Sequence, residues 1–113
     1  MTTLRVPVSG GELVVHQLAG DQHSERTLIA VHGITANGLS MQPLARALRA
    51  RDTGIRVLAP DLAGRACSNT VTGPWGMARH ATDVIAVIDA IGAGQVTVLG
   101  HSMGAYVAAV AAA

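Results

Sequence analysis

The chain has 113 residues, 50% of them hydrophobic and 13% charged, which excludes a disordered segment and allows one small domain over residues 1–113. The net charge of +1 gives no indication of a nucleic acid or an acidic partner. A single cysteine, Cys67, cannot form an internal disulfide, and we see neither a signal peptide nor an apolar stretch long enough to cross a membrane. We therefore expect a cytoplasmic protein that binds neither nucleic acid nor a membrane.

The first segments of the chain predict strands. Residues 4–8 and 12–18 are expected to form an antiparallel pair around a glycine turn at residues 9–11. The apolar runs at residues 27–31 and 56–59 then predict two short buried strands.

A helix is predicted after each of these buried strands. The first is expected to begin near Ser40 as its N-cap and to place Leu44 and Leu48 on one face. The second spans residues 76–91 and ends at Gly92. Its apolar face, with a period of 3.6 residues, consists of Met77, Ala81, Val84, Ile85, Ile88 and Ile91. The alternation of strands and helices implies a mostly parallel sheet with helices on both faces.

The most informative motif is Gly100-His101-Ser102-Met103-Gly104, directly after the apolar run at residues 96–99. This G-x-S-x-G pattern is typical of a nucleophile elbow, a strained turn from strand to helix that exposes the serine hydroxyl. The residues two before and two after the serine must be small, as Gly100 and Gly104 are. The alternative is that Ser102 is an ordinary helix N-cap.

Two further motifs follow strand ends. His32-Gly33-Ile34 follows the strand at 27–31, and the segment from Pro60 to Ser68 follows the strand at 56–59. With the serine motif, they resemble the α/β-hydrolase family over residues 28–113, in the family's N-terminal half. One position departs from the family pattern, because Ala66 stands where a second glycine is usual. The resemblance implies the first part of an α/β fold, with a mostly parallel sheet and an antiparallel N-terminal hairpin.

These motifs predict a serine hydrolase. Ser102 would attack a carbonyl carbon and form an acyl-enzyme. The backbone N–H groups of Met103 and Ile34 would hold the oxyanion, and Gly33 would allow the backbone to approach it closely. By resemblance, His32 orients the oxyanion loop; the alternative is a loop histidine with only local hydrogen bonds. We expect an ester, lactone, thioester or related carbonyl substrate, and no cofactor.

No histidine of the chain is a convincing catalytic base. His101 adjoins Ser102, but its side chain is expected to point to the other face of the sheet. We expect solvated positions for His16 and His23 in the N-terminal part of the chain and for His80 on the polar side of the second helix. The resemblance implies that the catalytic acidic residue and histidine follow the segment that this chain matches, so neither is expected among these residues.

The remaining polar residues have simpler interpretations. Asp61 is expected to fix backbone groups of its loop. Asp52 should end the first helix, while Asp83 and Asp89 fall on the polar side of the second. Cys67 is predicted to be an inert thiol in an exposed loop. Because no His/Cys spacing typical of a metal site occurs, the sequence predicts no metal site.

Aromatic and sulfur-containing side chains offer little more. Trp75 and Met41 could line an acyl pocket, but ordinary packing is the simpler interpretation of both.

The 113 residues by themselves are expected to be neither an efficient enzyme nor a stable monomer. The strand at residues 96–99 would expose one edge, next to the helix that carries Tyr106, Val107 and Val110. That edge would dock a missing C-terminal half or promote self-association. The alternative to a hydrolase is a noncatalytic, hydrolase-like protein that binds a small ligand or a partner.

Overall fold

The computed structural model describes residues 2–113, and within them one mixed sheet is flanked by helices. The strands are β1 (Thr2–Val8), β2 (Gly11–Ala19), β3 (Arg26–Val31), β4 (Ile55–Pro60) and β5 (Val96–Gly100). The α-helices are α1 (Gln42–Arg51), α2 (Met77–Ile91) and α3 (Met103–Ala112), and the short 3₁₀ helices are η1 (Gly38–Met41) and η2 (Ala66–Ser68).

The strand order in the sheet is β1-β2-β4-β3-β5. Strands β1 and β2 form the predicted antiparallel hairpin, with Gly10 in its turn at a φ of 84°. Strand β2 also pairs antiparallel with β4, whereas β3 lies parallel to both β4 and β5. The parallel strands therefore end at the same edge of the sheet, where the three predicted motifs begin.

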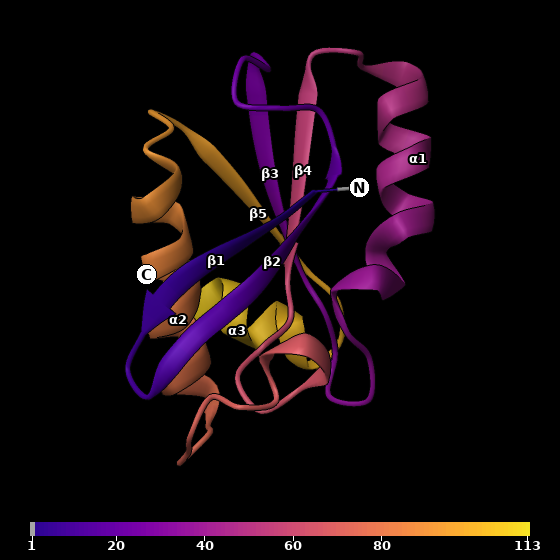
Figure 1. Ribbon diagram of the computed structural model, residues 1–113. Coiled ribbons are helices and arrows are strands. Elements are labelled where there is room, and N and C mark those ends of the chain that lie inside the picture. The colour runs from indigo at the N-terminus through magenta and orange to yellow at the C-terminus, as the bar shows by residue number, and fades with distance from the viewer. Residues whose placement is uncertain (1) are drawn as a thin grey trace.

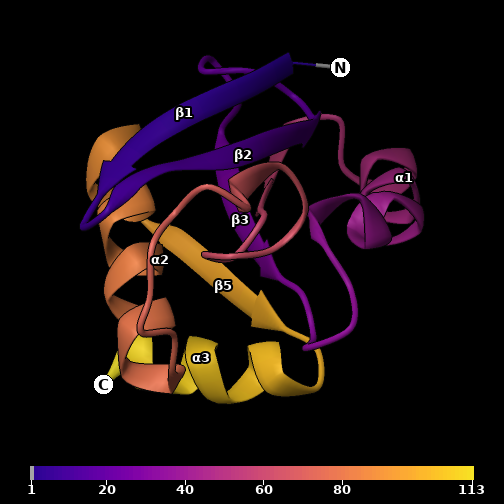
Figure 2. The same cartoon turned by 60° about the horizontal axis from the view of Figure 1, so that its bottom comes forward.

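Helices cover both faces of the sheet. Figure 1 shows α1 on one side and α2 on the other, and Figure 2 shows α3 starting where β5 ends. Side chains of β3 alternate between the two faces, because Ile29 and Val31 pack with residues of α2 and α3, whereas Leu28 and Ala30 pack with residues of α1. The helices predicted for both faces of the sheet are therefore present.

Helix α1 begins later than predicted. Ser40 lies inside η1, where its hydroxyl accepts a hydrogen bond from the Asn37 N–H at 3.2 Å, and Met41 is the residue before α1. The short helix η1 occupies the segment that the prediction gave to the first turn of α1. Leu44 and Leu48 pack against the sheet as expected.

The buried face of α2 agrees with the predicted one only in part. His80 and Asp83, both expected on the polar side, are 2% and 1% exposed, whereas Met77 and Ile85 of the predicted apolar face are each 42% exposed. Helix α2 contacts both the sheet and α3, so its buried surface is wider and turned relative to the apolar stripe. The helix ends at Gly92 in a left-handed conformation, as predicted.

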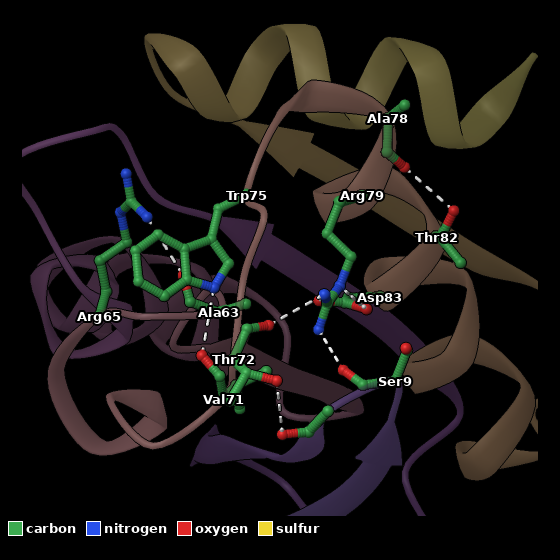
Figure 3. Close-up of polar contacts among 11 residues, drawn as sticks. Ser9, Ala63, Arg65, Val71, Thr72, Trp75, Ala78, Arg79, Thr82 and Asp83 are labelled. Carbon is green, nitrogen blue, oxygen red and sulfur yellow. Dashed lines mark hydrogen bonds and ion pairs between the residues drawn. The ribbon is translucent and has the colours of Figure 1, made fainter.

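Arg79 compensates the buried charge of Asp83 (Figure 3). Its Nε donates to both carboxylate oxygens at 3.0 Å, and its two terminal nitrogens donate to the carbonyl oxygens of Thr72 and Ser9. Burial raises the pKa of the Asp83 carboxyl, and the hydrogen bond and charge of Arg79 oppose that rise. One guanidinium thus links α2 to the β1–β2 turn and to the loop before α2.

We expect Arg79→Met to lower the free energy of unfolding by about 3 kcal/mol at pH 7, because it leaves a buried carboxylate unpaired. The pKa of Asp83 should rise further in this variant. A carboxyl group with a raised pKa contributes stability at low pH, and this stability is lost as the pH rises through that pKa. The difference in free energy of unfolding between wild type and Arg79→Met should therefore shrink toward pH 4. Urea unfolding at both pH values measures this, with exposed Arg46→Met as the control. Equal losses in the two variants would contradict the assignment.

Strand β5 lies at the end of the sheet, so within residues 2–113 only β3 pairs with it. Next to this strand, Tyr106 and Val110 of α3 are 70% and 48% exposed, as expected. Val107 of the same helix is fully buried in the hydrophobic core. No helix in the described residues is long and apolar enough to span a membrane.

Candidate active site

Ser102 occupies the sharp turn between β5 and α3. Its φ is 57° and its ψ is −123°, a backbone conformation that residues other than glycine rarely adopt. The side chain is exposed at the edge of the sheet where the parallel strands end. Strain of this kind costs about 1–3 kcal/mol and is common at functional sites.

The two flanking glycines are required by close backbone packing. A Cβ atom on Gly100 would overlap the carbonyl oxygen of Gly104 and lie 2.5 Å from the Cα of Ala105. A Cβ atom on Gly104 would overlap the carbonyl oxygen of Val31 and lie 2.7 Å from that of His32. The start of α3 therefore packs directly on the backbone of β5 and on the end of β3, and only glycine fits at either position.

The loop after β3 approaches Ser102 closely. The His101 N–H donates to the Val31 carbonyl at 3.0 Å, which ties the end of β5 to the end of β3. A Cβ atom on Gly33 would lie 3.1 Å from the Cβ of Ser102 and 3.6 Å from its Oγ. The predicted HG-x loop and the predicted serine turn are therefore neighbours.

The amide groups of Ile34 and Met103 are available to a ligand. Met103 is the first residue of α3, where an N–H has no acceptor within the helix. Among the loop and turn hydrogen bonds of residues 2–113, neither amide is a donor. The side chain of Ile34 is 61% exposed, so its loop is open to solvent.

His32 fixes the orientation of the Gly33–Ile34 peptide. Its Nε2 accepts a hydrogen bond from the Leu62 N–H at 3.0 Å, so its Nδ1 carries the hydrogen and donates to the Gly33 carbonyl at 2.6 Å. The same carbonyl accepts from the Ala36 N–H at 3.2 Å. Because a trans peptide directs N–H and C=O in opposite directions, the Ile34 N–H points away from both donors. Burial lowers the pKa of the fully buried His32, which keeps this ring neutral at pH 7.

The Asp61 carboxylate contacts nitrogen atoms from three parts of the chain. Its Oδ1 accepts from the Gly38 N–H at 2.7 Å, and its Oδ2 accepts from the Cys67 N–H at 3.1 Å and contacts His16 Nε2 at 2.9 Å. The predicted role of Asp61, fixing loop backbone groups, is confirmed. The predicted surface position of His16 is wrong, because β2 lies between two strands and His16 is 5% exposed.

The loop after β4 keeps its turn although one glycine is replaced. Ala66 adopts a φ of 43°, in the region that favours glycine, and Gly64 has a φ of 81°. The Ser68 hydroxyl accepts a hydrogen bond from the Val14 N–H at 2.9 Å and thereby joins the loop to β2. Trp75 packs its indole over Gly64 and donates to the Val71 carbonyl, which supports the packing interpretation.

An apolar pocket of about 480 Å³ opens beside Gly33. Met41 and Leu44 line it from the α1 side, together with Leu99 and His101 from the end of β5. His101 thus follows Leu99 toward the α1 side of the sheet, in agreement with the alternation expected along a strand.

His80 of α2 is the third buried histidine, after His16 and His32. Burial, with the charges of Arg65 and Arg79 and the neighbouring His32, lowers its pKa to about 4. Its Nδ1 has no hydrogen-bond partner in residues 2–113. The folded state therefore favours the neutral ring.

Acid is expected to destabilise the fold through His80. A lowered histidine pKa contributes stability above the unfolded value of 6.5 that is lost as the pH falls through the folded value of about 4. The loss should reach about 3 kcal/mol over this interval. His80→Leu should flatten the pH dependence of urea unfolding, and the exposed-residue control His23→Gln should not. An unchanged slope in His80→Leu would refute this.

Parallel strands with helices on both faces, and a positive-φ serine in a strand-to-helix turn, define an α/β protein with a nucleophile-elbow geometry. The family model described as alpha/beta hydrolase fold matches residues 26–113. The chain therefore belongs to the α/β-hydrolase family, as its motifs predicted. A search of curated proteins gave no significant match.

Solved structures agree with this family. A hypothetical protein of Pseudomonas aeruginosa PAO1 is 30% identical, with a TM-score of 0.83, over 99% of this chain and 38% of that one. An epoxide hydrolase from an endophytic Streptomyces is 27% identical, with a TM-score of 0.79, over 98% of this chain and 32% of that one. The thioesterase domain from the curacin biosynthetic pathway shares the fold, with 24% identity and a TM-score of 0.81, over 95% of this chain and 39% of that one. The chain thus spans about a third of the length of these relatives.

Proposed function

We propose that this chain supplies the nucleophile and the oxyanion hole of a serine hydrolase that acts on an ester, lactone, thioester or related carbonyl compound. The observation that carries the proposal is the position of Ser102, exposed at a positive φ beside the Gly33 loop. Ser102 Oγ would attack the carbonyl carbon. The Ile34 and Met103 N–H groups would hold the oxygen as it becomes negative.

The chemistry of serine favours a carbonyl substrate over an epoxide. Attack of a serine oxygen on a carbonyl carbon forms an ester, which water can hydrolyse to release the enzyme. Attack on an epoxide carbon would form an ether, which water does not cleave under the same conditions. The likeness to epoxide hydrolases therefore supports the fold, while the residue in the elbow supports acyl transfer.

The general base is expected outside these 113 residues. The ring nitrogens of His32 are both engaged, His16 contacts Asp61, and His80 is buried in α2. None of the hydrogen bonds in residues 2–113 joins a histidine to the Ser102 hydroxyl. A histidine and an acidic residue from the remaining two thirds of a full-length hydrolase would complete the site.

A fluorophosphonate probe tests the nucleophile directly. In a protein of the relatives' length that contains this chain, the probe should modify one residue, and peptide mass spectrometry should place the modification on Ser102. Labelling of Ser102 should disappear after heat denaturation, because the Ser102 hydroxyl is activated only in the folded site. Labelling of another residue, or none, would refute the proposal.

A noncatalytic binding protein is the second candidate. The absence of a base next to Ser102 within the described residues favours it. In that case a carbonyl ligand would bind to a full-length form without any acyl-enzyme, even when a downstream histidine and acidic residue are present. Trapping an acyl-enzyme by acid quench and mass spectrometry would exclude this candidate.

A further inference from the structure

Three side chains of types that can bind a metal, from different parts of the sequence, meet beside β4. His16 belongs to β2, Asp61 follows β4, and Cys67 lies in η2. One donor atom from each lies within 4.8 Å of the other two. The sequence shows no metal-binding spacing here, because the first two residues are 45 positions apart.

We propose that His16, Asp61 and Cys67 form a zinc-binding site. Imidazole, carboxylate and thiolate are all zinc ligands, and the thiolate disfavours magnesium and calcium. One Zn²⁺ with a thiolate, a carboxylate and a neutral imidazole has no net charge, which suits a site with two buried ligands. Because Cys67 is exposed, a solvent molecule can take the fourth, tetrahedral position.

The distances require only small movements. Bonds of 2.0–2.3 Å in a tetrahedron place ligand atoms about 3.3–3.6 Å apart. His16 Nε2 and Asp61 Oδ2 are 2.9 Å apart and would have to separate by a few tenths of an ångström. Cys67 would have to move inward by about 1 Å from the 4.8 Å limit, which an exposed residue of a 3₁₀ turn can do.

The groups around the carboxylate are arranged to orient it toward a metal. The Gly38 N–H holds Oδ1 at 2.7 Å and the Cys67 N–H holds Oδ2 at 3.1 Å. Such outer hydrogen bonds are a regular feature of metal sites. The thiol of Cys67 makes no hydrogen bond within residues 2–113, so coordination would break no hydrogen bond of the thiol.

Proton balance is simple. Zinc replaces the hydrogen bond between His16 and Asp61, and His16 coordinates through Nε2 with a proton on Nδ1 only. The Cys67 thiol loses its proton to solvent as the sulfur–zinc bond forms. Asp61 coordinates as the carboxylate. Binding therefore releases the thiol proton to solvent.

The site is separate from Ser102 and its inference does not depend on the proposed function. Zinc would join β2 to the loop after β4, and through the Gly38 N–H it would be connected to the loop that carries Ile34. We expect its main effect to be a higher melting temperature of the protein, because the metal binds only the folded arrangement of these ligands.

Competition with a chromophoric zinc chelator measures the affinity of tag-free protein for Zn²⁺, and Co²⁺ serves as a spectroscopic substitute. We expect one zinc ion per chain and a near-ultraviolet thiolate-to-cobalt charge-transfer band. Cys67→Ser should abolish the band and weaken zinc binding at least tenfold, and His16→Gln should weaken it at least tenfold. The exposed-histidine control His23→Gln should leave both unchanged.

Equal zinc affinities in the wild-type protein and Cys67→Ser would overturn the proposal, as would a cobalt complex without the charge-transfer band. Loss of binding in His23→Gln alone would assign the zinc to an adventitious surface site and would also overturn it. If His16→Gln fails to fold, Cys67→Ser decides the question, because the Cys67 side chain is exposed and makes no hydrogen bond in the described residues.

Discussion

Replacing Ser102 by alanine in a full-length form is expected to lower kcat on an activated ester by about 10⁴- to 10⁶-fold. The substitution removes the atom that forms the acyl-enzyme and leaves the Ile34 and Met103 amides in place. The value of KM should therefore change little, because those amides still contact the bound substrate. Steady-state kinetics with p-nitrophenyl acetate measures both constants.

The control for this experiment is Ser9→Ala. Ser9 lies in the β1–β2 turn and contributes only its backbone carbonyl to the contact with Arg79, so kcat should be unchanged. The positive φ at position 102 is about equally unfavourable for alanine and for serine. The Ser102→Ala and Ser9→Ala proteins should therefore unfold at similar urea concentrations. Full activity of a folded Ser102→Ala protein would refute the assignment of the nucleophile.

Gly104→Ala is expected to lower the free energy of unfolding by about 4 kcal/mol or more. Overpacking usually costs about 1–3 kcal/mol, because flexible side chains can move away. Here the new methyl group would overlap the Val31 carbonyl oxygen and meet that of His32, and both belong to the backbone at the end of β3. Either α3 or β3 would have to move, and the approach of Gly33 to Ser102 would be lost with it.

Gly94→Ala provides a matched control for that prediction. An added Cβ at Gly94 has no atom within 4 Å, and this glycine has no positive φ. Its substitution should change the free energy of unfolding by less than about 0.5 kcal/mol. Urea unfolding followed by circular dichroism compares the two variants, and a small effect of Gly104→Ala would contradict the tight packing at the elbow.

Much of the site could be predicted from sequence because its rules are local. The turn at Ser102 needs small residues at fixed distances along the chain, and Gly100 and Gly104 satisfy this. Strand and helix alternation then places the HG-x loop and the serine turn at the same sheet edge. The proximity of Gly33 to Ser102 follows from that order.

The apolar periodicity of α2 was less informative. A period of 3.6 residues identifies one buried stripe, but it does not say how many elements pack on the helix. Helix α2 contacts both the sheet and α3, His80 and Asp83 are buried, and the guanidinium of Arg79 makes the burial of Asp83 tolerable. The pattern therefore predicted the helix and its end at Gly92 correctly, and its buried face only in part, because Met77 and Ile85 are exposed whereas Ala81, Val84, Ile88 and Ile91 pack in or against the core.

The sequence by itself determined the family, the succession of strands and helices along the chain, and the strained serine turn. Each of these depends on motifs or periodic patterns whose residues lie close together in the chain. Only the tertiary structure decided the surroundings of His16, Asp61 and Cys67. Their proximity depends on β2 lying beside β4 and on the loop after β4 folding back across β2. No spacing in the sequence encodes the contact among these three side chains, because it forms only when strands that are distant in the sequence pair.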